Sequence, residues 1–150
     1  MSEPSIDPGS RKIGWFCSFI PEELILAAGL EPGRIQGRVD AIEQADAYMF
    51  SNICPYVKNL LDSGLRLKLD GVAGIIFANS CDGVRRLHDL WRQYVRPPFS
   101  YMLEVPKNLN EDAVTYFADR LLDLKNSLEG TFGVEISESK LKQAIEVMNE

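Results

Sequence analysis

The sequence predicts an α/β fold in which a parallel four-stranded sheet carries helices on both faces, of the flavodoxin-like or truncated Rossmann-like type. Residues 72–78 (VAGIIFA) form a continuous apolar run, which is typical of a strand buried on both sides in a parallel sheet. Segments with strand composition alternate along the chain with segments of helical periodicity. A chain of 150 residues is long enough for one domain of this kind.

The first third of the chain predicts a strand, a helix and a second, shorter strand. Residues 12–20 (KIGWFCSFI) are rich in aromatic and branched side chains and stop at a proline, as strands often do. Pro21 fits the first turn of a helix that ends at Gly29. A short strand is predicted around residues 34–36, and residues 39–47 are predicted to form a loop that contains a helical turn.

The middle of the chain predicts a helix, the buried strand and a second helix. Asn52 is expected to cap a helix that has Pro55 in its first turn and ends near Gly64. After the strand at residues 72–78, apolar residues recur at helical spacing opposite charged ones, which predicts an amphipathic helix with an inward stripe of Val84, Leu87, Trp91 and Val95.

The last third predicts one more strand and two helices. Residues 99–105 read as a strand bounded by prolines, and Asn110 is expected to cap a long helix over residues 111–128. A loop is predicted at Gly130 and Gly133. Ser137 opens the final helix, whose predicted inward residues are Leu141, Ile145 and Met148.

Composition and charge exclude several classes of protein. The chain is 45% hydrophobic and 25% charged, and its net charge of −6 argues against nucleic-acid or anionic-membrane binding. Residues 1–11 lack the apolar core of a signal peptide and are expected to be a flexible leader before a single domain at residues 12–150. No apolar run approaches the length of a membrane span. Three cysteines without an export signal predict reduced thiols and a cytoplasmic protein.

The three cysteines are predicted to meet at one edge of the sheet. Cys17 ends the first strand, Cys54 lies at a helix start, and Cys81 lies between the buried strand and its helix. Right-handed crossovers bring these positions to the carboxyl edge, where helix N-termini favour thiolates. Three thiolates without a neighbouring histidine suit a soft metal site, above all an iron–sulfur cluster, although a single cysteine at a strand end is more often part of the core.

Four motifs carry a resemblance to a known family. They read, in chain order, GWFCSFIPEELILAAGL, SNICPYVKNLLDSG, DGVAGIIFANSCDGVRRLHDLW and FSYMLEVPKN. These motifs resemble those of 2-hydroxyacyl-CoA dehydratase and benzoyl-CoA reductase subunits, including the D-component of 2-hydroxyglutaryl-CoA dehydratase. The resemblance extends over nearly all of residues 13–149, and it implies that the chain corresponds to the N-terminal part of a longer, two-domain subunit.

The resemblance implies a cofactor, partners and a reaction. The family's enzymes belong to anaerobes and amino-acid fermentation; each of two related subunits holds a [4Fe–4S] cluster, and an ATP-dependent iron–sulfur activator supplies one electron. In the dehydratases a ketyl radical forms at the thioester carbonyl of a 2-hydroxyacyl-CoA, and loss of water gives an enoyl-CoA. The resemblance implies that Cys54 and Cys81 are cluster ligands. The third ligand is either Cys17 or a residue of the second domain.

Two other residues are candidate catalytic groups. Ser18 is a candidate for hydrogen bonding to a substrate hydroxyl or thioester oxygen, and the alternative is a strand-end serine that bonds to backbone. Glu23 is a candidate acid or base, and the alternative is a glutamate that complements the helix dipole.

Two other functions compete with the dehydratase interpretation. One is a benzoyl-CoA reductase-type subunit that reduces an aromatic acyl-CoA. The other is a truncated, non-catalytic relative that serves as a docking or electron-transfer module. The four motifs do not separate these possibilities.

Overall fold

A parallel four-stranded sheet forms the centre of the molecule, as predicted. The computed structural model describes residues 9–37, 40–66 and 71–150. All described strand pairs are parallel, and the strand order is β2-β1-β3-β4. The strands are β1 (Lys12–Trp15), β2 (Glu31–Arg34), β3 (Val72–Ala78) and β4 (Ser100–Leu103).

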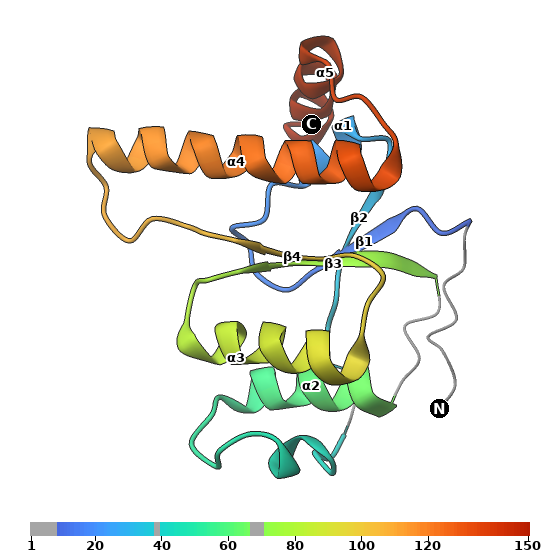
Figure 1. Ribbon diagram of the computed structural model, residues 1–150, viewed down its shortest axis with the longest axis vertical. Helices are drawn as coiled ribbons and strands as arrows, with labels where there is room; N and C mark the ends of the chain where they lie inside the picture. The colour runs from blue at the N-terminus through green and yellow to red at the C-terminus, as the bar shows by residue number, and fades with distance from the viewer. Residues whose placement is uncertain (1–8, 38–39, 67–70) are drawn as a thin grey trace.

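Helices cover both faces of this sheet (Figure 1). The helices α1 (Glu22–Ala27), α4 (Glu111–Phe132) and α5 (Glu138–Met148) lie on one face, and α2 (Pro55–Arg66) and α3 (Asp82–Leu90) lie on the other. A 3-10 helix, Ala45–Ala47, lies between β2 and α2, and α3 continues into a π-helical turn, Trp91–Val95. Each face of the sheet therefore has its own apolar core.

The first strand is shorter than predicted, because the chain leaves the sheet after Trp15 and turns at residues 17–20. Strand β1 ends at Trp15, and the N–H of Ile20 donates to the carbonyl of Cys17 (3.1 Å) to close a turn. The second strand lies earlier than the predicted residues 34–36, since it begins at Glu31. It runs through a proline because β2 is an edge strand, where a missing N–H leaves no ladder bond unmade.

Several helix boundaries also differ from the predictions. Residue Gly64 lies inside α2 and Gly130 inside α4, whereas Gly133 ends α4 with φ = 63°. The residue that accepts the first hydrogen bond of α2 is Cys54 rather than Asn52, since the N–H of Lys58 donates to the Cys54 carbonyl (3.2 Å). Strand β4 is also shorter than the predicted residues 99–105, whereas the predicted helical turn within residues 40–47 is confirmed.

The predicted inward face of α5 is wrong in two of its residues. The predicted inward residues Ile145 and Met148 are 43% and 41% exposed, whereas Ala144 is buried. Helix α5 packs against α1, whose buried surface includes the small residues Ala27 and Ala28. Small side chains let two helices approach closely, so the contact is centred on an alanine instead of the larger residues.

Gly64 in α2 and Gly130 in α4 predict opposite effects of the same substitution. An added Cβ at Gly64 would lie 2.7 Å from Cζ2 of Trp91, whereas at Gly130 nothing lies within 4 Å. Gly64→Ala should therefore lower the free energy of unfolding by about 1–3 kcal/mol through overpacking. Gly130→Ala should raise it by about 0.5–1 kcal/mol, because alanine loses less backbone freedom in a helix. Urea unfolding of both variants measures the difference, and equal effects would contradict it.

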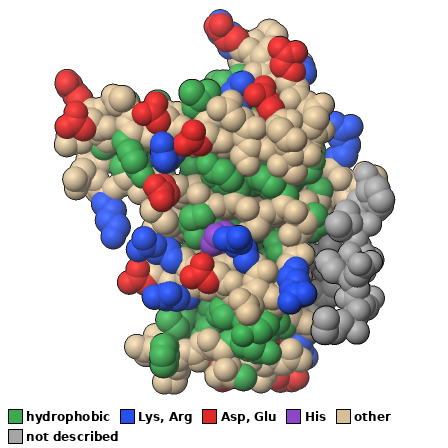
Figure 2. Space-filling model, in the orientation of Figure 1, with side chains coloured by type: hydrophobic (Ala, Val, Ile, Leu, Met, Phe, Trp, Pro, Cys, Tyr) green, Lys and Arg blue, Asp and Glu red, His purple; other side chains and the backbone are tan. Residues whose placement is uncertain are grey.

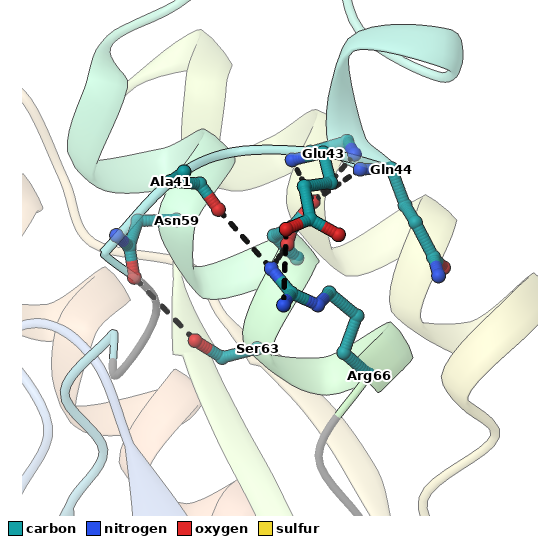
Figure 3. Close-up of polar contacts among 8 residues, drawn as sticks. Ala41, Glu43, Gln44, Asn59, Ser63 and Arg66 are labelled. Atoms are coloured by element: carbon teal, nitrogen blue, oxygen red, sulfur yellow. Dashed lines mark hydrogen bonds and ion pairs between the residues drawn. The ribbon is translucent and has the colours of Figure 1, made fainter.

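A buried aspartate of α2 fixes the segment before this helix, and Figure 3 labels its partners Glu43, Gln44 and Arg66. Asp62 is fully buried, and its Oδ1 accepts hydrogen bonds from the backbone N–H groups of Glu43 (3.1 Å), Gln44 (2.6 Å) and Ala45 (2.8 Å). Its Oδ2 accepts from Arg66 Nη1 (3.0 Å). Burial alone would raise the pKa of Asp62, but these hydrogen bonds, led by the one from Ala45, outweigh burial and lower the pKa.

Other side chains of α2 hold the same segment. Arg66 Nη1 also donates to the carbonyl of Ala41 (3.1 Å), and Arg66 Nη2 pairs with Glu43 Oε1 (3.3 Å). Lys58 Nζ donates to Asp46 Oδ1 (2.6 Å). The chain that leads to Cys54 is thus fastened to the helix that Cys54 precedes.

The described end of the predicted leader bonds to the loop that follows α1. Residues 1–8 of the predicted leader lie outside the described residues, as does residue 39 at the start of a predicted loop. At the end of the leader, Arg11 Nε donates to the Gly29 carbonyl (3.0 Å). None of the helices in the described residues has the length and apolar character needed to cross a bilayer.

Candidate functional site

Two of the cysteines follow neighbouring strands at the same edge of the sheet. Cys17 follows the end of β1, and Cys81 follows the end of β3. Strands β1 and β3 are adjacent and parallel, with Trp15 paired to Ile76, so both loops start at the carboxyl edge. This is the edge where ligands bind in open α/β sheets.

Two of the thiols also precede neighbouring helices. Cys54 lies directly before α2 and Cys81 directly before α3, and these helices pack against each other on one face of the sheet (Figure 1). Cys81 is extended (φ = −154°, ψ = 165°), and its side chain makes no capping hydrogen bond. Its sulfur is therefore not engaged by the helix that it precedes, and the positive end of the α3 dipole lies beside it.

Two contacts connect the segments that carry the cysteines. At Gly83, an added Cβ would lie 3.3 Å from Cγ2 of Val57 and 3.7 Å from Sγ of Cys81. The first turn of α3 is thus packed against the first turn of α2, with the Cys81 sulfur beside the contact. In addition, Tyr56 Oη donates to the Phe16 carbonyl at 3.4 Å, which connects α2 with the turn that holds Cys17.

The thiols are accessible, but they do not form a complete metal site among themselves. Cys54 and Cys81 are exposed, Cys17 is half-buried, and all three are free thiols. In residues 9–37, 40–66 and 71–150, no three His, Cys, Asp or Glu side chains gather closely enough to hold a metal ion. Thiolates are the donors that soft metals prefer, so the cysteines have suitable chemistry, but the described residues do not gather into a three-ligand site in this conformation.

A cluster of aromatic rings packs in the core between the sheet and the helices α2 and α3. Phe16 lies 5.1 Å, centroid to centroid, from both Phe77 and Trp91, and the ring of His88 lies 5.0 Å from Phe77. Burial lowers the pKa of His88, although Asp89 acts in the opposite direction. The His88 ring thus packs edge-on against Phe77, and its burial favours the neutral form.

The outer surface of α3 carries mixed charge (Figure 2). Arg85 pairs with Asp82 at 3.6 Å, and Arg86 pairs with Asp89 at 3.8 Å. These four side chains are largely exposed, so the pairs are solvated contacts of small energetic value. The arginines are thus balanced by neighbouring carboxylates and do not form a basic patch.

Comparison with known proteins identifies the family. Residues 17–150 match the family model of the 2-hydroxyglutaryl-CoA dehydratase D-component, which extends over most of the chain. The chain belongs to this family. The match begins at Cys17 and includes Cys54 and Cys81, so all three thiols of this dehydratase-family chain lie within it.

Named relatives of this dehydratase-family chain include both reductase and dehydratase subunits. A benzoyl-CoA reductase subunit of Thauera aromatica is 31% identical over 147 residues, which is 96% of this chain and 38% of that protein. The (R)-phenyllactyl-CoA dehydratase beta subunit of Clostridium sporogenes is 27% identical, over 95% of this chain and 38% of that protein. The (R)-2-hydroxyglutaryl-CoA dehydratase beta subunit of Acidaminococcus fermentans is 28% identical, over 94% and 38%. The chain thus spans less than half the length of these relatives.

The two predicted catalytic residues lie in different surroundings in this dehydratase-family chain. Ser18 is exposed in the turn directly after Cys17. Glu23 is half-buried in the first turn of α1, on the face of the sheet opposite α2 and α3. The structure therefore keeps Ser18 beside a thiol, whereas Glu23 lies on the other face of the sheet from the two helices that Cys54 and Cys81 precede.

Sequence reasoning found one of the residues that arrange the thiols and missed two. The sequence predicts that Asn79, a short polar side chain directly after a buried strand, shapes the turn before Cys81, and in the structure Asn79 bonds to the segment after β4. The missed residues are Gly83, which packs against Val57, and Tyr56, which bonds to the Phe16 carbonyl. The contacts of Gly83 and Tyr56 span the fold and leave no local pattern.

Proposed function

We propose that this chain is part of a subunit of a 2-hydroxyacyl-CoA dehydratase, in which Cys54 and Cys81 bind a [4Fe–4S] cluster. The observation that carries this proposal is the pair of exposed, free thiols at the starts of two helices that pack together. Iron–sulfur clusters are held by cysteine thiolates, and helix N-termini favour the thiolate form. Membership of the dehydratase family supports the same assignment.

Each residue of the site has a separate task in this proposal. Cys54 and Cys81 donate sulfur, and the third ligand is Cys17 after a movement of its turn, or a residue from another part of the complete subunit. Ser18, exposed next to Cys17, would hydrogen-bond the acyl-CoA. Glu23 would act as an acid or base only if the acyl-CoA extends to the first turn of α1, because α1 lies on the other face of the sheet from α2 and α3. The bound cluster would supply one electron to the substrate thioester, for elimination of water through a ketyl radical.

The proposal also requires other proteins. The three relatives are named as single subunits of larger enzymes, which supports a homologous partner subunit. Large apolar side chains close in sequence to Cys17 and Cys54 are exposed, namely Phe19 (53%), Phe50 (83%) and Tyr56 (40%). Exposed apolar groups around a site are typical of a surface that another protein covers. We further propose that an ATP-dependent activator delivers the electron.

A benzoyl-CoA reductase-type subunit is the second candidate. The observation that favours it is the identity of 31% with the benzoyl-CoA reductase protein of Thauera aromatica, against 27% for the phenyllactyl-CoA dehydratase beta subunit. Both candidates use the same thiols in this chain, so one test of cluster binding applies to each. Turnover of an aromatic acyl-CoA against a 2-hydroxyacyl-CoA, measured with the partner subunit and activator added, separates them.

Anaerobic reconstitution of the full chain with iron and sulfide tests the cluster. The wild-type chain should take up iron and give the electron paramagnetic resonance signal of a reduced cubane. Cys54→Ala and Cys81→Ala should each lower iron uptake by roughly tenfold or more, because a lost ligand weakens a metal site at least as much as a lost outer-shell partner. Thermal melts followed by circular dichroism confirm that the variants remain folded.

Two comparisons make this test decisive. Cys17→Ala lowers iron uptake as strongly as the other variants only if Cys17 is the third ligand, and otherwise leaves it unchanged. A wild-type chain that binds no iron, or an iron content that stays at the wild-type level in Cys54→Ala and Cys81→Ala, would overturn the proposed site. The chain would then be a non-catalytic docking module.

A further inference from the structure

The side chain of Asn79 connects the loop of Cys81 to the segment that follows β4. The last residue pair of β3 and β4 is Ala78 with Leu103. Directly after it, the N–H of Asn79 donates to the Leu103 carbonyl (3.1 Å), and Asn79 Oδ1 accepts from the N–H of Val105 (2.7 Å). The two strands no longer pair beyond this point, and the amide side chain of Asn79 supplies the hydrogen bond that the next backbone group would have made.

This hydrogen bond is the last side-chain anchor before the thiol. Asn79 and Val105 are half-buried, and the next two residues, Ser80 and Cys81, are exposed. Within the described residues, the side chains of Ser80 and Cys81 make no hydrogen bond. The turn that presents the thiol is therefore held on its strand side by Asn79.

The other side of the turn is held by the start of α3. The N–H of Arg85 donates to the Cys81 carbonyl (3.2 Å), and Gly83 packs against Val57 of α2. Cys81 thus lies between an anchor on β4 and an anchor on α2. Loss of either anchor should widen the range of positions that its sulfur occupies relative to Cys54.

We infer that Asn79 is a positioning residue, which holds the Cys81 thiol where it and Cys54 can bind the same group. The inference rests on the proposed function, because it gives a purpose to the pair of thiols. It goes beyond that function by assigning a role to a side chain that touches neither thiol nor ligand. An acceptor oxygen at position 79 is the property that the role needs, so aspartate should replace asparagine and alanine should not.

Cross-linking in the cluster-free chain tests this role. In a Cys17→Ser background, a bifunctional bromobimane becomes fluorescent only after both ends have reacted, here with Cys54 and Cys81. Asn79→Ala should lower the yield of the fluorescent product, relative to single alkylation by monobromobimane, by roughly fivefold, which matches the loss of one neutral hydrogen bond. Asn79→Asp should restore the yield.

The chain offers a matched control for a general loss of stability. Asn110 Oδ1 accepts from the N–H of Ala113 (2.9 Å) at the start of α4, so Asn110→Ala removes the same kind of hydrogen bond elsewhere in the fold. This variant should melt earlier, as Asn79→Ala does, but keep the wild-type cross-linking yield.

The outcomes separate the inference from the proposed function. Equal yields in Asn79→Ala and the parent chain would overturn the inference and leave the thiol pair intact. An equal loss in Asn110→Ala would also overturn it, since stability alone would then explain the result. If the parent chain itself gives no fluorescent product, the thiols do not come together, and both the inference and the proposed cluster site fail.

Discussion

Asp62→Ala should lower the free energy of unfolding by about 3–5 kcal/mol, the cost of removing one partner of a buried charge pair. The substitution leaves three backbone N–H groups and one guanidinium without the carboxylate that accepts their hydrogen bonds. Since small domains are stabilised by only about 5–15 kcal/mol, this is a large share of the total. Urea unfolding followed by circular dichroism measures the loss.

Glu43→Ala is the matched control for this prediction. Glu43 also pairs with Arg66, at 3.3 Å, but its side chain is 60% exposed. Removing such a surface carboxylate should cost about 1 kcal/mol or less. A loss as large as that of Asp62→Ala would mean that charge on Arg66, and not the backbone contacts of Asp62, holds the segment before α2.

The same aspartate should make stability depend on pH in the acidic range. The pKa of Asp62 is lower in the folded chain than the ordinary value near 4, against the effect of burial, because of its hydrogen bonds. A lowered folded pKa gives a contribution that is fully present above the unfolded pKa and is lost as the pH falls through the folded pKa. The difference in unfolding free energy between wild type and Asp62→Asn should therefore shrink below about pH 4. A difference that stays constant from about pH 7 to about pH 3 would contradict this.

The order of elements could be predicted because local signals mark it. The run at Val72–Ala78 is apolar throughout, and this pattern is typical of a strand that is covered on both faces. Proline and asparagine mark the ends of several elements, and Asn110 and Ser137 cap α4 and α5 as expected. The helix-start positions of Cys54 and Cys81 followed from the same kind of signal.

Contacts between distant segments could not be predicted in this way. An aspartate in α2 reads as part of a solvated helix face, but Asp62 is buried by a segment that precedes the helix. Likewise, Phe16 continues the composition of a strand, but its ring enters the core with Phe77 and Trp91. The neighbourhood of the thiols depends on such contacts as well, through Gly83.

Trp91→Ala should also cost about 3–5 kcal/mol, the usual loss when a large buried aromatic side chain is removed. Trp91 is fully buried, its ring contacts Phe16 and Phe77, and the glycine at position 64 lets α2 approach it. The cavity would open in the core between the sheet and the helices α2 and α3, beside Phe16. The expected result is an earlier urea transition, whereas alkylation of Cys17 under native conditions should stay at the parent rate, because Cys17 packs against the core on the other face of the sheet.

Trp91→Phe separates ring volume from the polar atom. Within the described residues, Nε1 of Trp91 is buried and has no hydrogen-bond acceptor. Burying a polar N–H without a partner costs about 1–3 kcal/mol, so its removal should offset much of the packing lost with the smaller ring. Trp91→Phe should therefore cost about 1.5 kcal/mol or less. A loss close to that of Trp91→Ala would mean that a buried water accepts the hydrogen bond of the indole N–H. The aromatic cluster of Phe16, Phe77 and Trp91 would then be stabilised by polar contacts as well as by packing.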